Sequence, residues 1–246
     1  MPSVKKRQIR FYGLSIGFAL LLGGIAASLT IGVRASVPAA PLPLPALDTQ
    51  AGQPEATEIA VLSGGCFWGV QGVFEHVTGV TRAVSGYAGG KKETASYEQV
   101  SSGRTGHAES VEVTFDPHKI SYGQILQIFF TVALDPTELN RQGPDEGTQY
   151  RSEIWYSDET QHQIAQSYIA QLDKAHVFDA PIVTRVDANS GFFPAEDYHQ
   201  DFLVRHPNYP YIVFNDLPKV ANLKRMFPQA YLDKPVLVLA GQNATE

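Results

Sequence analysis

A proline-rich segment at residues 36–56 constrains the fold more than any other feature, because it separates the chain into parts. Its five prolines cannot donate a backbone hydrogen bond and they favour an extended conformation, so we expect a spacer here. The sequence after it, residues 57–228, has the length of one globular domain. A C-terminal tail is expected at residues 229–246.

Residues 1–35 have the composition of a targeting segment. They contain five basic residues and no acidic one, and residues 11–33 carry no charge. As a helix, these 23 residues would be about 34 Å long, which is enough to cross a bilayer core of about 30 Å. The small residues around Arg34 also fit a signal-peptidase site. A cleaved signal peptide and an uncleaved anchor are both open, and both predict an exported, periplasmic or otherwise extracytoplasmic domain.

The rest of the chain is acidic, with 14 basic and 25 acidic residues for a net charge of −11. Binding of phosphates needs clustered Lys and Arg, so this balance argues against a nucleic-acid partner. Membrane contact is expected only through the N-terminal segment. Cys66 is the only cysteine, which excludes an intramolecular disulfide and a cysteine-rich zinc site, and no metal site is predicted.

Short strands and helices alternate through the remaining sequence, which is typical of an α+β domain. Strands are expected at residues 58–63, 81–90 (passing into a glycine-rich loop), 107–117, 151–157 and 182–188. Helices are expected at residues 68–77, 121–133, 157–175, 194–206 and 216–227. The helix caps are expected to be Ser121, Ser157 or Asp158, with Pro194 opening the fourth helix. We predict a single two-layer domain, a mixed open sheet with packed helices built as a ferredoxin-like core with elaborations.

The segment SGGCFWG, residues 63–69, places Cys66 between the first strand and the first helix. Unpaired backbone N–H groups and the positive end of the helix dipole are expected to favour the thiolate there. Gly64 and Gly65 allow a sharp turn and a close approach of substrate to the backbone. A reactive thiol fits this position, and so does a small buried cysteine packed against aromatic neighbours.

Three later segments are unusually polar for their surroundings. They are residues 94–109 with Tyr97, His107 and Glu109, residues 142–151 with Asp145 and Tyr150, and residues 191–202 with Glu196, Tyr198 and His199. Each segment alone has a structural explanation: a solvated acid at a strand end, a core tyrosine with a bonded hydroxyl, or a histidine satisfied locally.

The segment GCFWG at residues 65–69 resembles the signature of the A-type peptide methionine sulfoxide reductases. Four further segments are similar to the same family and follow the family's order: residues 96–109, 141–156, 192–202 and 210–227. The resemblance covers residues 58–228, the whole of the expected domain.

The resemblance implies an enzyme that reduces methionine S-sulfoxide, in proteins or as the free amino acid. It assigns the attack on the sulfoxide sulfur to Cys66 and the donation of a proton to Glu109. Tyr97 and Tyr150 would hold the sulfoxide oxygen, with Asp145 on the same side.

The resemblance also implies a substrate pocket. Phe67 and Trp68 would enclose the S-methyl group, whose burial is worth roughly 1 kcal/mol, with Gly65 and His199 as further substrate-binding residues. No cofactor is implied apart from an external thiol reductant.

One departure from the family concerns how the enzyme is recycled. Many relatives resolve the sulfenic acid with a second cysteine, and this chain has none; position 212, where some relatives carry it, is Ile212. The implied sulfenic acid on Cys66 must therefore be reduced directly by an external thiol such as thioredoxin or glutathione/glutaredoxin.

Two other classes of function stay open from the residues alone. One is a cysteine hydrolase or acyltransferase with His107 or His199 as the base. The other is a non-catalytic module, tethered to the membrane, that uses Phe67 and Trp68 to bind a thioether.

Overall fold

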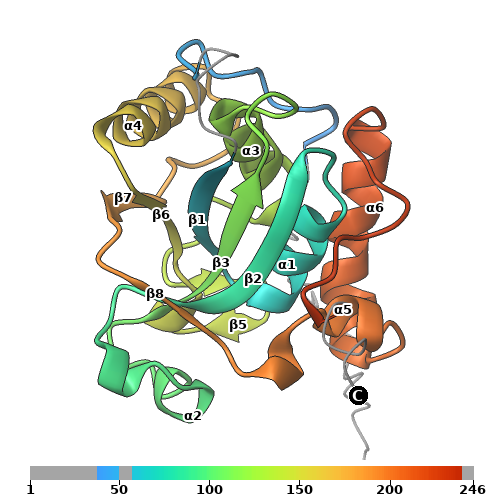
Figure 1. Cartoon of the computed structure of the whole chain (residues 1–246). Helices are drawn as coiled ribbons and strands as arrows, with labels where there is room; N and C mark the ends of the chain where they lie inside the picture. The colour runs from blue at the N-terminus through green and yellow to red at the C-terminus, as the bar shows by residue number, and fades with distance from the viewer. Residues whose placement is uncertain (1–37, 50–56, 240–246) are drawn as a thin grey trace, which may run out of the picture. The chain divides into compact units, whose positions relative to one another are not determined.

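The computed structural model describes residues 38–49 and 57–239. A six-stranded sheet lies at the centre (Figure 1). Its strands are β1 (Glu58–Gly64), β2 (Val80–Ala88), β3 (Ala108–Phe115), β6 (Ser152–Tyr156), β7 (Arg185–Ala188) and β8 (Phe192–Pro194). The strand order is β7-β6-β1-β3-β2-β8, and every pair is antiparallel except the parallel pair β6–β7.

The helices are short apart from one. They are α1 (Phe67–Glu75), α2 (Tyr97–Val100), α3 (Tyr122–Ile128), α4 (Glu159–Lys174), α5 (Phe202–Arg205) and α6 (Leu217–Met226). A π-helical turn at Phe129–Ala133 continues α3, and another at Ile212–Asp216 precedes α6. Separate 3₁₀ turns lie at Lys92–Thr94, Thr148–Tyr150 and Asp197–His199. A two-stranded ladder joins β4 (Arg141–Gln142) to β5 (Asp145–Glu146).

The central part of the fold has the ferredoxin-like arrangement. The chain runs β1-α1-β2-β3-α3-β6, and these strands lie in the order β6-β1-β3-β2. Two split β-α-β units, each with its helix on the same side of an antiparallel sheet, produce this order. The predicted α+β fold with additional elements is therefore confirmed, and the additions are α2, β4, β5, β7, β8, α4, α5 and α6.

The two faces of the sheet have different surroundings. Alternate residues of a strand face opposite sides, so Leu62 of β1 lies in the main core with α1 while Val61 lies in a small cluster on the other face. On β3, Val111 and Val113 belong to the main core. Glu109 has the same parity as these two valines, so its side chain points to the side on which α1 lies.

Two of the predicted helix caps are confirmed. The hydroxyl of Ser121 accepts from the backbone N–H of Gln124 at 3.2 Å, and Gln124 bonds back to Ser121 as a capping box. The carboxylate of Asp158, rather than the hydroxyl of Ser157, caps α4 by accepting from the N–H of Gln161 at 2.8 Å. The helix predicted at residues 121–133 is α-helical only to residue 128 and then widens into a π-helical turn.

The helix predicted at residues 194–206 is wrong. Pro194 ends the edge strand β8 and lies opposite Gly86 of β2, an edge position where its missing N–H is tolerated. A left-handed backbone at Asp201, with φ of 55°, then separates the 3₁₀ turn from α5. The carboxylate of Asp201 accepts hydrogen bonds at 2.9 Å from the N–H groups of Val238 and Leu239, so tertiary contacts hold this break.

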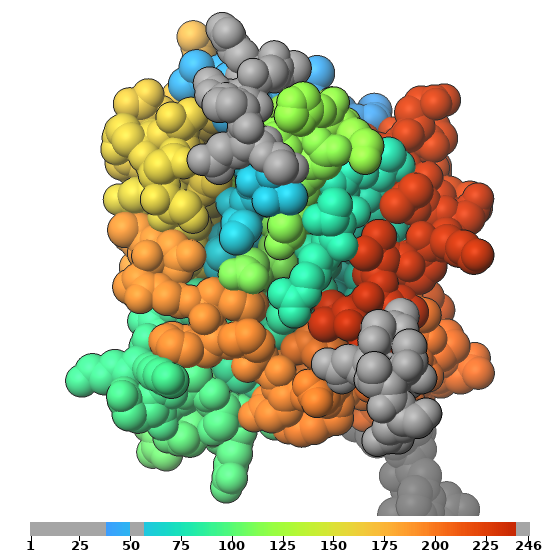
Figure 2. Space-filling view, in the orientation of Figure 1, coloured from blue at the N-terminus to red at the C-terminus, as the bar shows by residue number. Residues whose placement is uncertain are grey.

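Residues 38–49 form no helix or strand, but they are bound to the domain and are not a free spacer. Leu42 is only 5% exposed and belongs to the main core. Its carbonyl accepts from the Gln127 side chain of α3 at 2.5 Å, and the carbonyl of Pro43 accepts from the Tyr168 hydroxyl of α4 at 2.8 Å. Figure 2 shows the segment, in blue, at the top of the view beside α4.

The predicted targeting segment, residues 1–35, lies outside the described residues. Within residues 38–49 and 57–239, no helix has the length and hydropathy needed to cross a membrane.

Leu42→Ala should destabilise the protein by about 2 to 5 kcal/mol, because it leaves a cavity in the core. Leu44→Ala is the matched control: Leu44 is 55% exposed, and its loss should change the free energy of unfolding by less than about 0.5 kcal/mol. Urea unfolding of the three proteins measures both effects. Equal stability of the two variants would mean that the segment does not contribute to the core.

Candidate active site

Cys66 is the N-cap residue of α1, directly after the end of β1. The turn between them depends on Gly65, which has a φ of +85°. A Cβ atom at Gly65 would lie 2.4 Å from Cβ of Gln142, so only glycine fits. Gln142 is held in place by its own bonds to the backbone N–H and carbonyl of Asp135, at 2.9 and 2.6 Å.

Glu109 lies beside Cys66, as the strand parity of β3 requires. Its Oε2 accepts a hydrogen bond of 3.0 Å from the N–H of Phe67, the first residue of α1. The side chain is buried, and burial raises the pKa of the carboxyl to about 8 although the Phe67 N–H opposes the shift. At neutral pH the group is therefore mostly protonated. With Oε2 engaged as an acceptor, Oε1 is the oxygen left to donate that proton.

The protonation state of Cys66 in the free enzyme differs from the prediction. Burial raises the pKa of the thiol well above its ordinary value, and the carboxyl groups of Glu109 and Asp216 raise it further. The hydrogen bond from the Trp68 N–H at the helix start acts in the opposite direction and does not compensate. The expectation of a resting thiolate at the helix N-terminus is therefore wrong, because burial and nearby carboxyls outweigh the dipole.

Tyr97 and Tyr150 approach the same point from different segments. Tyr97 begins α2, and Tyr150 ends the 3₁₀ turn that precedes β6. Burial and then the negative charge of Glu109 raise the pKa of both phenols, and the charge of Cys66 adds to this. Both hydroxyls therefore keep their protons and can act as hydrogen-bond donors near Glu109 and Cys66.

Asp145 is joined to a residue that the sequence analysis did not single out. Its Oδ2 accepts a hydrogen bond from the hydroxyl of Tyr211, whose ring meets Trp68 edge-on at 6.0 Å between centroids. Burial raises the pKa of the Asp145 carboxyl, whereas this bond lowers it. Tyr211 lies in the segment 210–227 that resembles the family, so the segment was recognised but its hydroxyl was not assigned a role.

Aromatic rings pack together next to the thiol and form an aromatic wall made of Phe67, Trp68, His199 and Phe202. Phe67 is buried against His199 at 5.0 Å, while the partly exposed Trp68 stacks on Phe202 at 3.8 Å. The indole N–H of Trp68 donates to Nδ1 of His199 at 3.1 Å. Burial lowers the pKa of His199 to about 4, so the ring is neutral and carries its proton on Nε2.

Neither histidine proposed as a general base is arranged for that task. Both nitrogens of His107 are engaged away from the thiol, Nδ1 with the N–H of Gly90 at 3.2 Å and Nε2 with the carbonyl of Lys91 at 2.9 Å. His199 uses Nδ1 to hold Trp68. In the described part of the chain, no histidine nitrogen is hydrogen-bonded to Cys66, and a thiol hydrolase would need that contact.

No group of three or more metal-ligating side chains is arranged around a common point among residues 38–49 and 57–239. The chemistry that the described residues can support is that of a thiol, a protonated acid and two phenols around an aromatic wall.

Comparisons with known proteins agree with this site. A family model described as peptide methionine sulfoxide reductase matches residues 58–231. The peptide methionine sulfoxide reductase MsrA 2 of Mesorhizobium japonicum is 65% identical over 187 residues, covering 76% of this chain and 96% of that protein. An MsrA 2 of Synechocystis sp. is 52% identical over 178 residues, covering 72% of this chain and 81% of that protein.

Two solved structures share the fold. Methionine sulfoxide reductase A of Corynebacterium diphtheriae has 34% identity and a TM-score of 0.54, covering 71% of this chain and 88% of that one. Reduced Mxr1 from Saccharomyces cerevisiae has 29% identity and a TM-score of 0.56, covering 64% of this chain and 90% of that one.

A thiol at a helix start beside a protonated carboxylic acid fits a thiol-dependent oxidoreductase, in which the thiol attacks and the acid supplies a proton. The chain belongs to the peptide methionine sulfoxide reductase family, in its A type, and is an enzyme that reduces methionine sulfoxide. The family resemblance expected from the sequence is confirmed.

Alkylation of Cys66 by iodoacetamide should follow a pH curve displaced above that of ordinary cysteine, because its pKa is raised. Glu109→Gln removes a negative charge that is present above about pH 8, and should move the curve to lower pH. Since Cys66 is the only cysteine, the mass of the intact protein reports this group alone. The urea-unfolded protein is the control for an ordinary thiol, and coincident curves for Glu109→Gln and wild type would contradict the electrostatic contact.

Proposed function

We propose that this enzyme repairs methionine S-sulfoxide in polypeptides, with Cys66 as the nucleophile and Glu109 as the proton donor. The hydrogen bond of 3.0 Å from the Phe67 N–H to Glu109 carries this proposal, because it fixes a protonated acid at the first turn of the helix that Cys66 caps. Tyr97, Tyr150 and Asp145 are proposed to complete the polar side of the site, and Phe67 and Trp68 its apolar side.

The reaction transfers one oxygen atom from the substrate to the enzyme. Glu109 gives its proton to the sulfoxide oxygen, which weakens the S–O bond, and the sulfur of Cys66 bonds to the sulfoxide sulfur. The hydroxyl then moves from the substrate sulfur to the Cys66 sulfur: the S–O bond and the temporary S–S bond to the substrate both break, and an S–O bond forms on Cys66. Methionine leaves with its sulfur reduced by two electrons, and Cys66 is left oxidised as a sulfenic acid. The proton lost from the thiol replaces the one that Glu109 donated, so the step needs no net proton.

The arrangement of the site favours one epimer. The sulfoxide sulfur carries a methyl group, an oxygen, a side-chain methylene and a lone pair, so its configuration decides which group meets which wall. The methyl group packs against the aromatic rings, and the hydroxyls of Tyr97 and Tyr150 donate hydrogen bonds to the sulfoxide oxygen. With Cys66 placed on a third side, only one configuration satisfies all three contacts.

Exposed apolar side chains near the site favour a polypeptide substrate. The ring of Tyr198, 55% exposed, lies 4.2 Å from that of His199, and the ring of Tyr209, 49% exposed, lies 6.2 Å from that of Trp68. Phe214 in the following π-helical turn is 75% exposed. Exposed apolar groups gathered at a site mark contacts with another chain, and a free amino acid would leave them uncovered.

Recycling must use a thiol from another molecule, because Cys66 is the only cysteine. One donor thiol attacks the sulfenic acid, releasing water and forming a mixed disulfide with Cys66. A second donor thiol then breaks that disulfide and restores the Cys66 thiol, so two electrons return to the enzyme per turnover. Thioredoxin and the glutathione/glutaredoxin system are the proposed donors.

The N-terminal segment supports a location outside the cytoplasm, either released or anchored by residues 11–33. Fractionation of cells producing the full chain should recover the enzyme in the periplasm or in the membrane fraction. The mass of the purified protein would separate the two, since cleavage near Arg34 removes the segment. Recovery in the cytoplasm alone would contradict export.

Cys66→Ser should abolish reduction, and Glu109→Gln should slow the single-turnover rate by about 10² to 10⁴-fold, as expected for loss of a general acid. The assay mixes excess enzyme with a peptide containing methionine S-sulfoxide, without reductant, and measures methionine by chromatography. Reduction by Cys66→Ser at the wild-type rate would overturn the proposed nucleophile. An unchanged rate in Glu109→Gln would remove Glu109 as the acid, and a wild-type enzyme that forms no methionine would contradict the proposed polypeptide substrate.

A further inference from the structure

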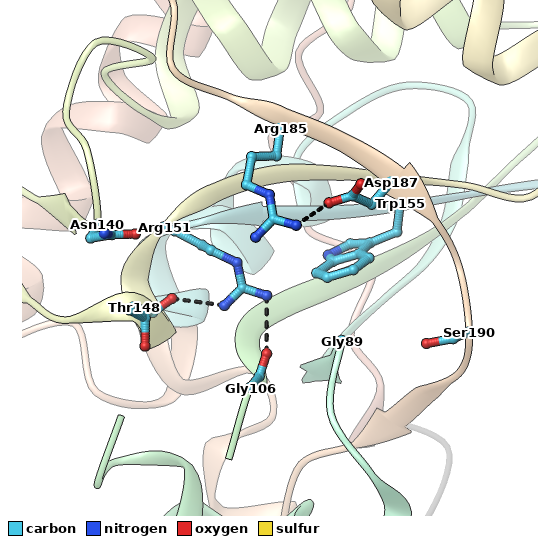
Figure 3. Close-up of a pocket in the computed structure, with 9 residues that line it drawn as sticks. All are labelled: Gly89, Gly106, Asn140, Thr148, Arg151, Trp155, Arg185, Asp187 and Ser190. Carbon is cyan, nitrogen blue, oxygen red and sulfur yellow. Dashed lines mark hydrogen bonds and ion pairs between the residues drawn. The ribbon is translucent and has the colours of Figure 1, made fainter. Parts of the chain in front are cut away.

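A cavity of about 540 Å³ lies on the face of the sheet opposite Cys66 (Figure 3). Its walls include Trp155 of β6 and Arg151, the residue before β6. Trp155 lies on the opposite side of the sheet from its neighbour Ile154 of the main core. The proposed reaction does not use this cavity. The Arg151 side chain in its wall, however, makes hydrogen bonds to loops that carry active-site residues.

The guanidinium of Arg151 makes three hydrogen bonds, two to its own stretch of chain and one to the segment before β3. Nη1 donates to the carbonyl of Thr148 at 2.8 Å, and Nη2 donates to the carbonyl of Gly106 at 3.1 Å. Nε donates to the carboxylate of Glu153 at 2.5 Å. Figure 3 shows the two carbonyl bonds reaching in different directions from one planar group.

The two segments held by the carbonyl bonds carry the polar side of the active site. Gly106 lies just before β3, three residues ahead of Glu109, which is near the start of that strand. Thr148 begins the 3₁₀ turn that ends at Tyr150. The same turn is joined to the loop after α2 by a bond of 3.0 Å from the Thr148 hydroxyl to the carbonyl of Gly103. A single side chain therefore sets the spacing between the proposed acid and one of the phenols.

The surroundings of Arg151 hold it in one orientation. Arg151 is only 8% exposed, and its charge is balanced by Glu153, which is fully buried. The ring of Trp155 lies 5.5 Å from the guanidinium carbon. A Cβ atom at Gly89 would lie 2.9 Å from Nη2 of Arg151 and 2.4 Å from the Trp155 ring. The backbone of Gly89 therefore packs closely against both side chains. Lysine has the charge but not the planar fork that makes these bonds.

We infer that Arg151 is a positioning residue for sulfoxide reduction, which holds the Glu109 and Tyr150 segments at the spacing that the substrate oxygen requires. It acts from behind the sheet and touches no reacting atom. This inference rests on the proposed function, because its kinetic test measures sulfoxide reduction; the alkylation test described below does not need that activity. A displacement of about 1 Å at a reacting centre can lower a rate about 10²-fold. Loss of the Arg151 side chain should therefore lower kcat.

The experiment compares Arg151→Met with Arg185→Met. Arg185 lines the same cavity, but its side chain is 59% exposed and pairs with Glu153 and Asp187 rather than with the loop carbonyls. Arg151→Met should lower kcat about 10²-fold with dithiothreitol as reductant, and Arg151→Lys should recover little of it. Arg185→Met should stay within about twofold of wild type.

Two further readouts separate positioning from general loss of structure. Guanidinium ion at millimolar concentration can enter the cavity and should restore part of the kcat of Arg151→Met, but not that of Arg185→Met. The pH curve for alkylation of Cys66 should move in Arg151→Met toward that of Glu109→Gln, because the carboxyl moves away from the sulfur. This second readout needs no turnover, so it tests the inference even if sulfoxide reduction is not observed.

A wild-type kcat in Arg151→Met would overturn the inference. So would a loss that matches the unfolded fraction at the assay temperature, with no response to guanidinium and an unchanged alkylation curve.

Discussion

The site depends on one hydrogen bond, from the backbone N–H of Phe67 to the carboxyl of Glu109. It joins the first residue of α1 to the beginning of β3, so the acid meets the thiol only if helix and strand keep their relative position. Gly65 and Gln142 hold the helix side of this contact, and Arg151 holds the strand side from behind the sheet. The ferredoxin-like core places these elements, and the loops around it supply the remaining groups.

Much of the fold follows from local rules that the sequence displays. The capping box at Ser121 and the cap at Asp158 need only neighbouring residues, so their helices start where the pattern predicts. The alternation in β3 likewise predicts that Glu109 shares a face with Val111. The site residues taken from the family resemblance, including Tyr97, lie in the segments that the structure brings together.

The errors concern properties that depend on distant contacts. Pro194 looks like a helix opening, but pairing with β2 makes it the end of an edge strand. Prolines at residues 38–49 prevent regular structure, yet they do not reveal that Leu42 fills the core. The ionisation of Cys66 was misjudged for the same reason: the helix start is local, whereas burial and Asp216 come from the rest of the fold. Arg151 gave no signal, because its bond to Gly106, 45 residues earlier, is known only in three dimensions.

The protonated, enclosed state of Cys66 has a consequence for the lifetime of the enzyme in oxidising surroundings. Peroxide attacks thiolates far faster than thiols, so a sulfur with a raised pKa and 9% exposure is a slow target between turnovers. The sulfenic acid has no second cysteine to trap it, so a donor thiol must reach it before peroxide carries it on to an irreversible sulfinic acid. Burial thus protects the resting thiol, whereas protection of the sulfenic acid depends on the supply of donor thiol.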